Sequence, residues 1–325
     1  MGIKVANGYR FLRLGFRFYL LHHRFTSLFV REIWPLFAEM MDFLPDEQAR
    51  HLRYRVKNYT TILAPFFGSL LFRLHRLKPN KQQRRLLAMV GAATAFFDLI
   101  YDENWAQGQK ITFPPSPGSD PIGRLVFRLY QLIMKDAPMQ QPLLHWINYI
   151  SQIEQESCSQ KSLLTQAEIE EITFRKGGAG LMVFRLLVPV EITYPEEQAL
   201  MKVGALIQLM DDMADVWQDI QERITTPASF YPTPALLADH IENKFSEMTE
   251  ALMQAGFSAR VVNDFCFSLY AAFLVGKMHA YRLTDYMRRK QKSLSQLTKP
   301  EVILRPGLIF WYAYVGQLLR FTCSY

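Results

Sequence analysis

Cysteine is scarce in this chain: three residues, Cys158, Cys266 and Cys323, occur among 325. Their odd number and the lack of CxxC spacing argue against a disulfide framework and against a zinc site. The sequence also lacks any run of about 18 uncharged apolar residues, which argues against a transmembrane helix. Arginines interrupt the apolar stretch near the N-terminus, so no secretory signal is expected. These absences favour a protein of the reducing cytoplasm.

Acidic residues are outnumbered, since 30 Asp and Glu stand against 37 Lys and Arg, for a formal net charge of +7. A basic chain attracts anions such as nucleic acid, anionic lipid or a phosphorylated substrate. Zinc-finger spacing, aromatic RNA-binding motifs and a Gly-rich phosphate loop are missing, so no nucleic-acid partner is expected. The aromatic share of 14% indicates an apolar cavity, a membrane-contacting surface or simply an aromatic core.

Strand-like alternation is nearly absent as well, whereas apolar residues recur at helical spacing along most of the chain. Helices are expected over residues 8–40, 46–78, 82–107, 122–157, 166–190, 195–223, 235–256, 258–291 and 299–322. Proline-containing stretches at 111–121 and 226–234 predict loops. We therefore expect an all-α protein with a basic, aromatic N-terminal helical segment at 1–45 and a single helical domain at 46–325.

Aspartates spaced four apart form a first candidate site, in the stretch IQLMDDMADVWQD. On a helix, Asp211, Asp215 and Asp219 share one face. Three like charges on a largely apolar helix require cations, and oxygen-only ligands favour magnesium, manganese or calcium over zinc. Asp212 lies about 100° around the helix and is expected to form a hydrogen bond instead of binding metal.

A second pair, Asp98 and Asp102, has the same spacing and follows an apolar stretch. Either cluster alone is consistent with a polar helix end and incidental spacing. Two such clusters in one helical chain make coincidence a weaker explanation. Magnesium prefers a few carboxylates together with water and substrate phosphates, so the pattern suits a metal-bridged diphosphate. Metal and cationic side chains then stabilise the negative charge that develops on a leaving diphosphate.

At these residues the sequence resembles the class I isoprenoid synthases, the superfamily of trans-prenyltransferases and class I terpene synthases. Their second aspartate motif reads FQxxDDxxD, and Ile207 to Asp215 reads IQLMDDMAD. Upstream, RKGGAG resembles a lysine motif that contacts diphosphate in that family. The resemblance implies an isoprenoid-synthase helical bundle around an apolar central cavity. It also implies magnesium bound by Asp98, Asp102, Asp211, Asp215 and Asp219, the first four of them catalytic, and a prenyl diphosphate bound by Arg175, Lys176, Gln208 and Arg223.

Some of these assignments have alternatives. The RKGGAG glycines permit a helix break or close approach to a ligand, but they also suit a helix-packing surface. Arg223 follows Asp219 by four residues, so it either contacts diphosphate or forms an ion pair with Asp219. Tyr281 and Arg282 resemble, in reversed order, a late Arg–Tyr pair of some terpene synthases.

Departures from the family pattern bear on the reaction. Chain-elongating members carry paired arginines after the first motif, whereas Glu103, Asn104 and Trp105 follow Asp102 here. We therefore expect a terpene synthase that converts an allylic prenyl diphosphate to a hydrocarbon or alcohol and diphosphate. The alternatives are a two-substrate prenyltransferase, elongating or condensing like squalene and phytoene synthases, and a catalytically silent isoprenoid-binding protein. The arginine-rich second motif of the condensing enzymes is not matched.

Arginines and aromatic residues interleave over residues 8–34. Such a helix suits an anionic membrane interface, but packing against the helical domain is the commoner fate of an amphipathic helix. The expected location is therefore the cytoplasm, with peripheral membrane contact through this segment as one of two interpretations. The sequence is compatible with a homodimer but does not determine the oligomeric state.

Overall fold

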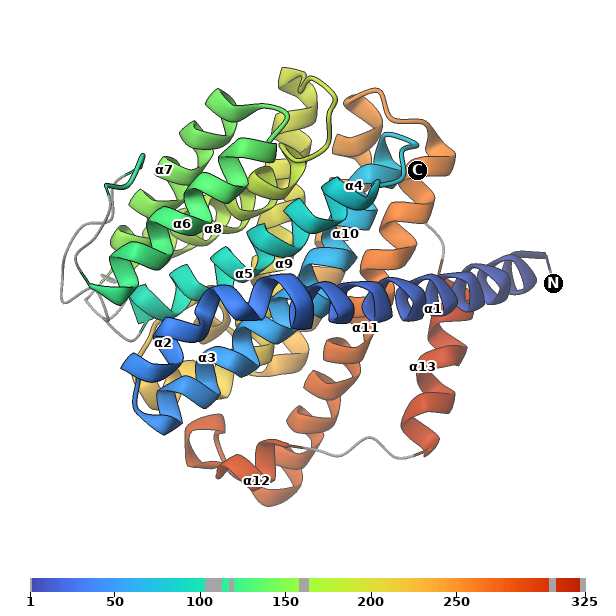
Figure 1. Cartoon of the computed structure of the whole chain (residues 1–325). Coiled ribbons are helices and arrows are strands. Elements are labelled where there is room, and N and C mark those ends of the chain that lie inside the picture. Colours follow the sequence, from blue (N-terminus) through green and yellow to red (C-terminus); the bar gives the residue numbers. More distant parts are fainter. Residues whose placement is uncertain (1, 103–112, 117–119, 158–163, 304–307, 322–325) are drawn as a thin grey trace. The chain divides into compact units, whose positions relative to one another are not determined.

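The computed structural model describes residues 2–102, 113–116, 120–157, 164–303 and 308–321 (Figure 1). Within these ranges the regular elements are helical, which confirms the all-α class. The chain divides into two compact units. Unit 1 comprises Met1–Arg13, Ser159–Gly178 and Ile192–Tyr325, and unit 2 comprises Leu14–Cys158 and Ala179–Glu191. The predicted boundary at residue 45 stays a prediction, as does the apolar central cavity.

Helix α1 (Gly2–Leu28) begins in unit 1 and continues into unit 2 as one long helix (Figure 1). The further elements of unit 2 are η1 (Phe29–Ile33), η2 (Trp34–Phe37), α2 (Ala38–Phe43), α3 (Asp46–Asn58), η3 (Tyr59–Leu63), α4 (Ala64–Leu74), α5 (Lys81–Asp102), α6 (Pro121–Asp136) and α7 (Gln140–Ser157). Helix α5 packs against α3, η3, α4 and α6. Its apolar residues, such as Leu87, Phe96 and Leu99, are almost completely buried, so α5 is the core helix of this unit.

Near Pro65 the helical stretch contains a π-helical turn, η3. Proline has no N–H, so it cannot bond to the carbonyl four residues earlier, that of Thr61. The helix widens just before it, where the Ala64 N–H bonds to the Tyr59 carbonyl. The Thr61 carbonyl oxygen lies 3.0 Å from Nδ1 of His22 on α1, which supplies the hydrogen bond that the proline cannot.

Helix α8 (Gln166–Arg185) runs from unit 1 into unit 2. The further elements of unit 1 are α9 (Tyr194–Glu222), η5 (Pro227–Phe230), α10 (Pro234–Gln254), α11 (Ala259–Lys290), η6 (Leu294–Gln296), α12 (Lys299–Val302) and α13 (Leu308–Arg320). Helix α10 lies against both α9 and α11, and α13 packs on α11. By length and composition α11 could cross a membrane, but more than half of its apolar window is buried, as in a core helix.

The two terminal helices meet within unit 1. The Asn7 side chain, on α1, donates hydrogen bonds through Nδ2 to the carbonyls of Leu319 (3.2 Å) and Phe321 (2.7 Å). Phe11 contacts Tyr314 edge to face, with ring centroids 6.1 Å apart. Asn7 is almost completely buried, so this polar link lies inside the unit and not on its surface.

The observed bounds correct several predicted ones. Helix α1 begins at Gly2 and not near residue 8, and the helix predicted for 46–78 is divided by η3 and ends at Leu74. Helix α8 ends at Arg185, five residues short of the prediction for 166–190. Residues 103–107, predicted to prolong α5, lie outside the described residues.

Candidate functional site

Helix α9 carries the predicted aspartate row in unit 1. Asp211 and Asp215 are exposed, and Asp219 is half-buried. Their four-residue spacing within one helix places them on one face over about 12 Å. The Thr226 hydroxyl donates a hydrogen bond to Oδ2 of Asp219 at 3.3 Å. The row therefore extends from an exposed carboxylate to one that is held at its buried end.

Within this row, burial and neighbouring negative charges dominate the electrostatics of Asp219. Burial, followed by the charge of Asp215, raises the pKa of Asp219 to about 7, although the hydrogen bond from Thr226 acts in the opposite direction. The charges of Asp211 and Glu222 add to the effect. Ionisation of a carboxyl group so close to like charges costs free energy, and a bound cation would offset that cost.

Asp212 differs from the three aspartates of the row because it is buried, with 7% of its surface exposed. Its Oδ1 accepts a hydrogen bond from Nε2 of Gln208 at 3.0 Å, and Oδ2 is buried without a hydrogen-bond partner among the described residues. Burial raises the pKa of Asp212 to about 8, while the hydrogen bond from Gln208 and the charge of Lys176 act in the opposite direction. The carboxyl group of Asp212 therefore lies inside the protein beside the row, and not on the exposed face that carries Asp211 and Asp215.

At the RKGGAG segment the backbone of α8 lies directly against that of α9. A Cβ built at Gly177 would lie 2.2 Å from the carbonyl oxygen of Gly204, and one built at Gly178 would lie 2.5 Å from Met201. The two backbones therefore touch directly, which only glycine allows. Helix α8 continues through this segment without a break, so of the alternatives for these glycines the structure shows helix packing.

This crossing brings the basic pair of α8 towards the carboxylates of α9. The positive charge of Lys176 lowers the pKa of Asp212, so the two groups are electrostatic neighbours. Arg175 lies 3.7 Å from Glu171, measured from Nε to Oε1, one turn earlier on α8. Both basic side chains are half-buried, as expected for charges at the edge of a site and not on an open surface.

Gln208 and Arg223, the other predicted substrate contacts, have structural partners on α9. Besides Asp212, Gln208 approaches Oδ2 of Asp211 at 3.4 Å. Arg223 ends α9 in the left-handed conformation, with φ of 58°, and its backbone N–H donates to the carbonyls of Asp219 and Ile220. Their roles towards a substrate stay predictions.

Asp98 lies on α5 in unit 2, where the hydroxyl of Tyr59 donates to its Oδ2 at 2.7 Å and Nη2 of Arg55 at 3.3 Å. Sequence reasoning missed Tyr59, although Arg55 and Tyr59 are four residues apart and so share a helical face. Asp102 is the last residue of α5, and its side chain lies outside the described residues.

The donors on α9 fit magnesium by their chemistry. Asp211, Asp215 and Asp219 offer only oxygen ligands, which hard divalent cations prefer. Among the described residues no group of three or more His, Cys, Asp or Glu side chains converges on one metal position. A linear row of carboxylates suits ions completed by water and substrate phosphates, and not a cage built by protein alone.

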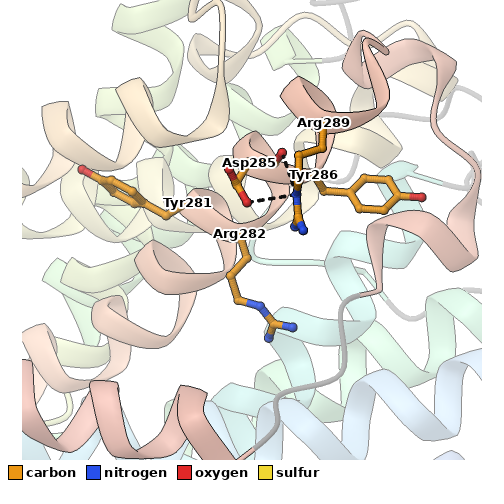
Figure 2. Close-up of a pocket in the computed structure, with 5 residues that line it drawn as sticks. All are labelled: Tyr281, Arg282, Asp285, Tyr286 and Arg289. Atoms are coloured by element: carbon orange, nitrogen blue, oxygen red, sulfur yellow. Dashed lines mark hydrogen bonds and ion pairs between the residues drawn. The ribbon is translucent and has the colours of Figure 1, made fainter.

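A surface cavity of about 360 Å³ lies elsewhere in unit 1, on α11. Figure 2 shows Asp285 paired with Arg289, while the side chain of Arg282 extends away from that pair. Tyr281 and Tyr286 complete the lining. The hydroxyl of Tyr281 donates to Asp239, so Tyr281 is engaged with α10. The residues that line this cavity do not include the aspartates of α9.

Comparisons with known proteins give one structural likeness. No family model and no curated protein matches the chain. The crystal structure of a dehydrosqualene synthase in complex with ligand is similar over 95% of this chain and 97% of that one, with 15% identity and a TM-score of 0.37. At that TM-score the likeness carries no argument about substrate or activity, which must come from the residues themselves.

Proposed function

We propose that this chain is a magnesium-dependent enzyme of the class I isoprenoid synthase type, which ionises an allylic prenyl diphosphate. The observation that carries the proposal is the α8–α9 crossing, where a row of carboxylates with an excess of negative charge lies beside a half-buried lysine. Acidic residues for metal and a cation for phosphate are the groups that a metal–diphosphate complex requires together.

The residues would divide this work between them. Asp211, Asp215 and Asp219 would hold Mg²⁺, which neutralises charge on the leaving diphosphate when bound. Lys176 would contact a diphosphate oxygen, because a half-buried ammonium group beside the metal ligands is positioned for a charge-assisted hydrogen bond. Gln208 would position Asp211 and Asp212 through the hydrogen bonds it already makes. That Asp98 and Asp102 contribute to the same magnesium site stays a prediction.

Within this type we favour a terpene synthase, which acts on one substrate and releases a hydrocarbon or alcohol. The sequence lacks the paired arginines of elongating enzymes after Asp102 and the arginine-rich second motif of condensing ones. The alternative is a two-substrate prenyltransferase, which elongates a chain or condenses two prenyl diphosphates. The two reactions share the ionisation step that the α9 carboxylates would serve.

Product analysis separates these reactions. The purified chain is incubated with Mg²⁺ and prenyl diphosphates of increasing length, with and without isopentenyl diphosphate, and with EDTA as the metal-free control. Hydrocarbon or alcohol from one substrate indicates a synthase, and a product of twice the carbon number indicates condensation. A lengthened diphosphate only with isopentenyl diphosphate indicates elongation. Absence of turnover with every substrate contradicts the proposal in favour of a silent binding protein.

A binding measurement tests the site without turnover. Mg²⁺ and inorganic diphosphate together should raise the thermal unfolding midpoint, because a ligand bound only by the folded state stabilises it. Lys176→Ala should weaken diphosphate binding by about 10- to 100-fold, since a charge-assisted contact contributes about 1.5–3 kcal/mol. Lys202→Ala, at an exposed lysine of α9, is the matched control. Equal protection of both variants contradicts the role of Lys176.

A further inference from the structure

Helix α1 has apolar residues on two opposite faces. One face packs inside the protein: Phe25 is buried, and Phe18 contacts Phe66 with ring centroids 6.3 Å apart. The other face is exposed and equally apolar, with fractional exposures of 66% for Tyr9, 70% for Leu12, 65% for Phe16, 65% for Tyr19 and 37% for Leu20. The packing interpretation of this segment therefore accounts for only half of its apolar residues.

The exposed residues form one continuous stripe. At about 100° per residue, all five fall within an arc of about 100° on the helix and extend over about 16 Å of its length. We call Tyr9, Leu12, Phe16, Tyr19 and Leu20 the α1 stripe. A single exposed apolar side chain is ordinary on a protein surface, but a contiguous group that is bordered by charge marks a contact surface.

The charged side chains of α1 are of one sign, and Arg10, which adjoins Tyr9, pairs with Asp264 of α11 at 3.5 Å. Helix α1 contains no Asp or Glu over its 27 residues. The exposed Arg13 and Arg24 follow one edge of the stripe, at about 40° and 60° from Tyr9. Burial and then the charge of Arg24 lower the pKa of Arg84, which places a further basic residue beside this edge. The acidic Glu32, which follows in η1, is paired with Arg85 at 2.6 Å.

We propose that the α1 stripe and its arginines dock on the surface of an anionic lipid bilayer. Aromatic and aliphatic side chains would enter the headgroup region while arginines contact lipid phosphates, as in interfacial amphipathic helices. A second copy of this chain is the poorer occupant, because a symmetric contact would bring like-charged arginine edges together. This inference does not depend on the proposed reaction.

Vesicle flotation tests the docking surface. The full-length chain is mixed with vesicles of phosphatidylcholine alone or with phosphatidylglycerol, at low and high salt. We expect it to float with the phosphatidylglycerol vesicles and to be released by salt, which screens surface charge. Phe16→Ser/Tyr19→Ser should abolish flotation. Arg13→Glu/Arg24→Glu should weaken it at least about 30-fold, because each basic residue near an anionic surface contributes about 1 kcal/mol.

Matched variants control for general effects. Arg288→Glu/Arg289→Glu makes the same charge change at the end of α11, and Leu236→Ser/Val275→Ser removes exposed apolar residues from α10 and α11. Both should float like the original chain, and all variants should keep its helical circular dichroism and unfolding midpoint. The proposal is overturned if the original chain does not float. It is also overturned if control and stripe variants lose binding equally, or if the stripe variants lose only self-association in sedimentation velocity.

Discussion

Asp98 on α5 and Asp219 on α9 are both half-buried carboxylates from four-residue repeats, but their surroundings differ in sign. Around Asp98, unit 2 supplies a cation and a donor, the guanidinium of Arg55 and the hydroxyl of Tyr59. Around Asp219, unit 1 supplies burial and more carboxylates, and the pKa of Asp219 rises to about 7. The same spacing thus yields one carboxylate that its own unit compensates and one that it leaves in need of positive charge.

This difference separates two uses of a carboxylate. A compensated group adds to the stability of the fold, because its ion pair and hydrogen bond are present before any ligand arrives. A row with excess charge costs stability in the absence of a cation, and that cost becomes binding free energy when a cation arrives. Four experiments, taken from the largest expected effect to the smallest, test this comparison of the two sites.

Asp215→Asn should reduce turnover by about 10²–10³-fold, the range typical for loss of one electrostatic contact to a developing charge. The same loss is predicted for Asp98→Asn, which would show that a compensated carboxylate also serves the reaction. The measurement is product release under saturating Mg²⁺, with helical circular dichroism unchanged. Glu250→Gln, at an exposed carboxylate of α10, is the control. Full activity in the Asp98/Asp215 double variant would refute both assignments.

Gly177→Val should destabilise unit 1 by more than the about 1–3 kcal/mol of ordinary overpacking, because its Cβ would overlap the Gly204 carbonyl. Hydrogen exchange should quicken in α9, whereas α5 around Asp98 should keep its protection. Gly316→Ala, in α13, is the control: its Cβ would have no neighbour within 4 Å, so a helix-favouring change is tolerated. Unchanged protection of α9 would show that the backbone crossing is unimportant.

Asp98→Asn and Asp219→Asn should shift the thermal unfolding midpoint in opposite directions when measured in EDTA. Asp98→Asn weakens the contact with Arg55, at a cost of about 1–3 kcal/mol. Asp219→Asn removes a charge that burial and Asp215 disfavour, while the amide oxygen can still accept from Thr226. Its midpoint should rise, and its further gain from Mg²⁺ should be smaller. Shifts of the same sign would remove the contrast between the two sites.

We expect the smallest effect at Glu301, a carboxylate that has a cationic partner as Asp98 does. The effect is on how stability depends on pH. The side chain of Lys292, with backbone and hydroxyl hydrogen bonds from Thr298, lowers the pKa of Glu301 to about 2. A folded-state pKa below the unfolded value means that this stabilisation is present above about pH 4.5 and lost as pH falls towards 2. Glu301→Gln should flatten the fall in unfolding midpoint over that window. The matched variant Glu250→Gln should leave the fall unchanged.

The helical fold was predictable because its signals are local. Apolar spacing and the proline-rich stretches lie within a few residues of the elements they define. The aspartate row of α9 was predictable for the same reason, since a four-residue repeat fixes a helical face by itself. The π-helical turn η3 was not, because its hydrogen-bond pattern depends on His22 from another helix.

Contacts between residues far apart in the sequence limit how much of the candidate site can be predicted. Gly177 and Gly178 were recognisable as small residues, but their packing partner, Gly204, lies on another helix and carries no signal of its own. The hydrogen bond from Tyr59 to Asp98 likewise joins residues that only tertiary packing brings together. Which apolar residues of α1 are exposed could not be predicted. The residues of the α1 stripe alternate with buried ones of the same type, so composition alone does not assign each residue to a face.

The link between Asn7 and the end of α13 has a consequence for the order in which the chain folds. Unit 1 is assembled from three separate stretches, of which the first holds the start of α1 and the last holds α13. Unit 2 is complete once synthesis has passed Glu191. During translation the start of α1 must therefore wait for Leu319 and Phe321 before its polar contact can close. We expect a vectorial order in which unit 2 folds first and unit 1 closes only after α13 has been synthesised.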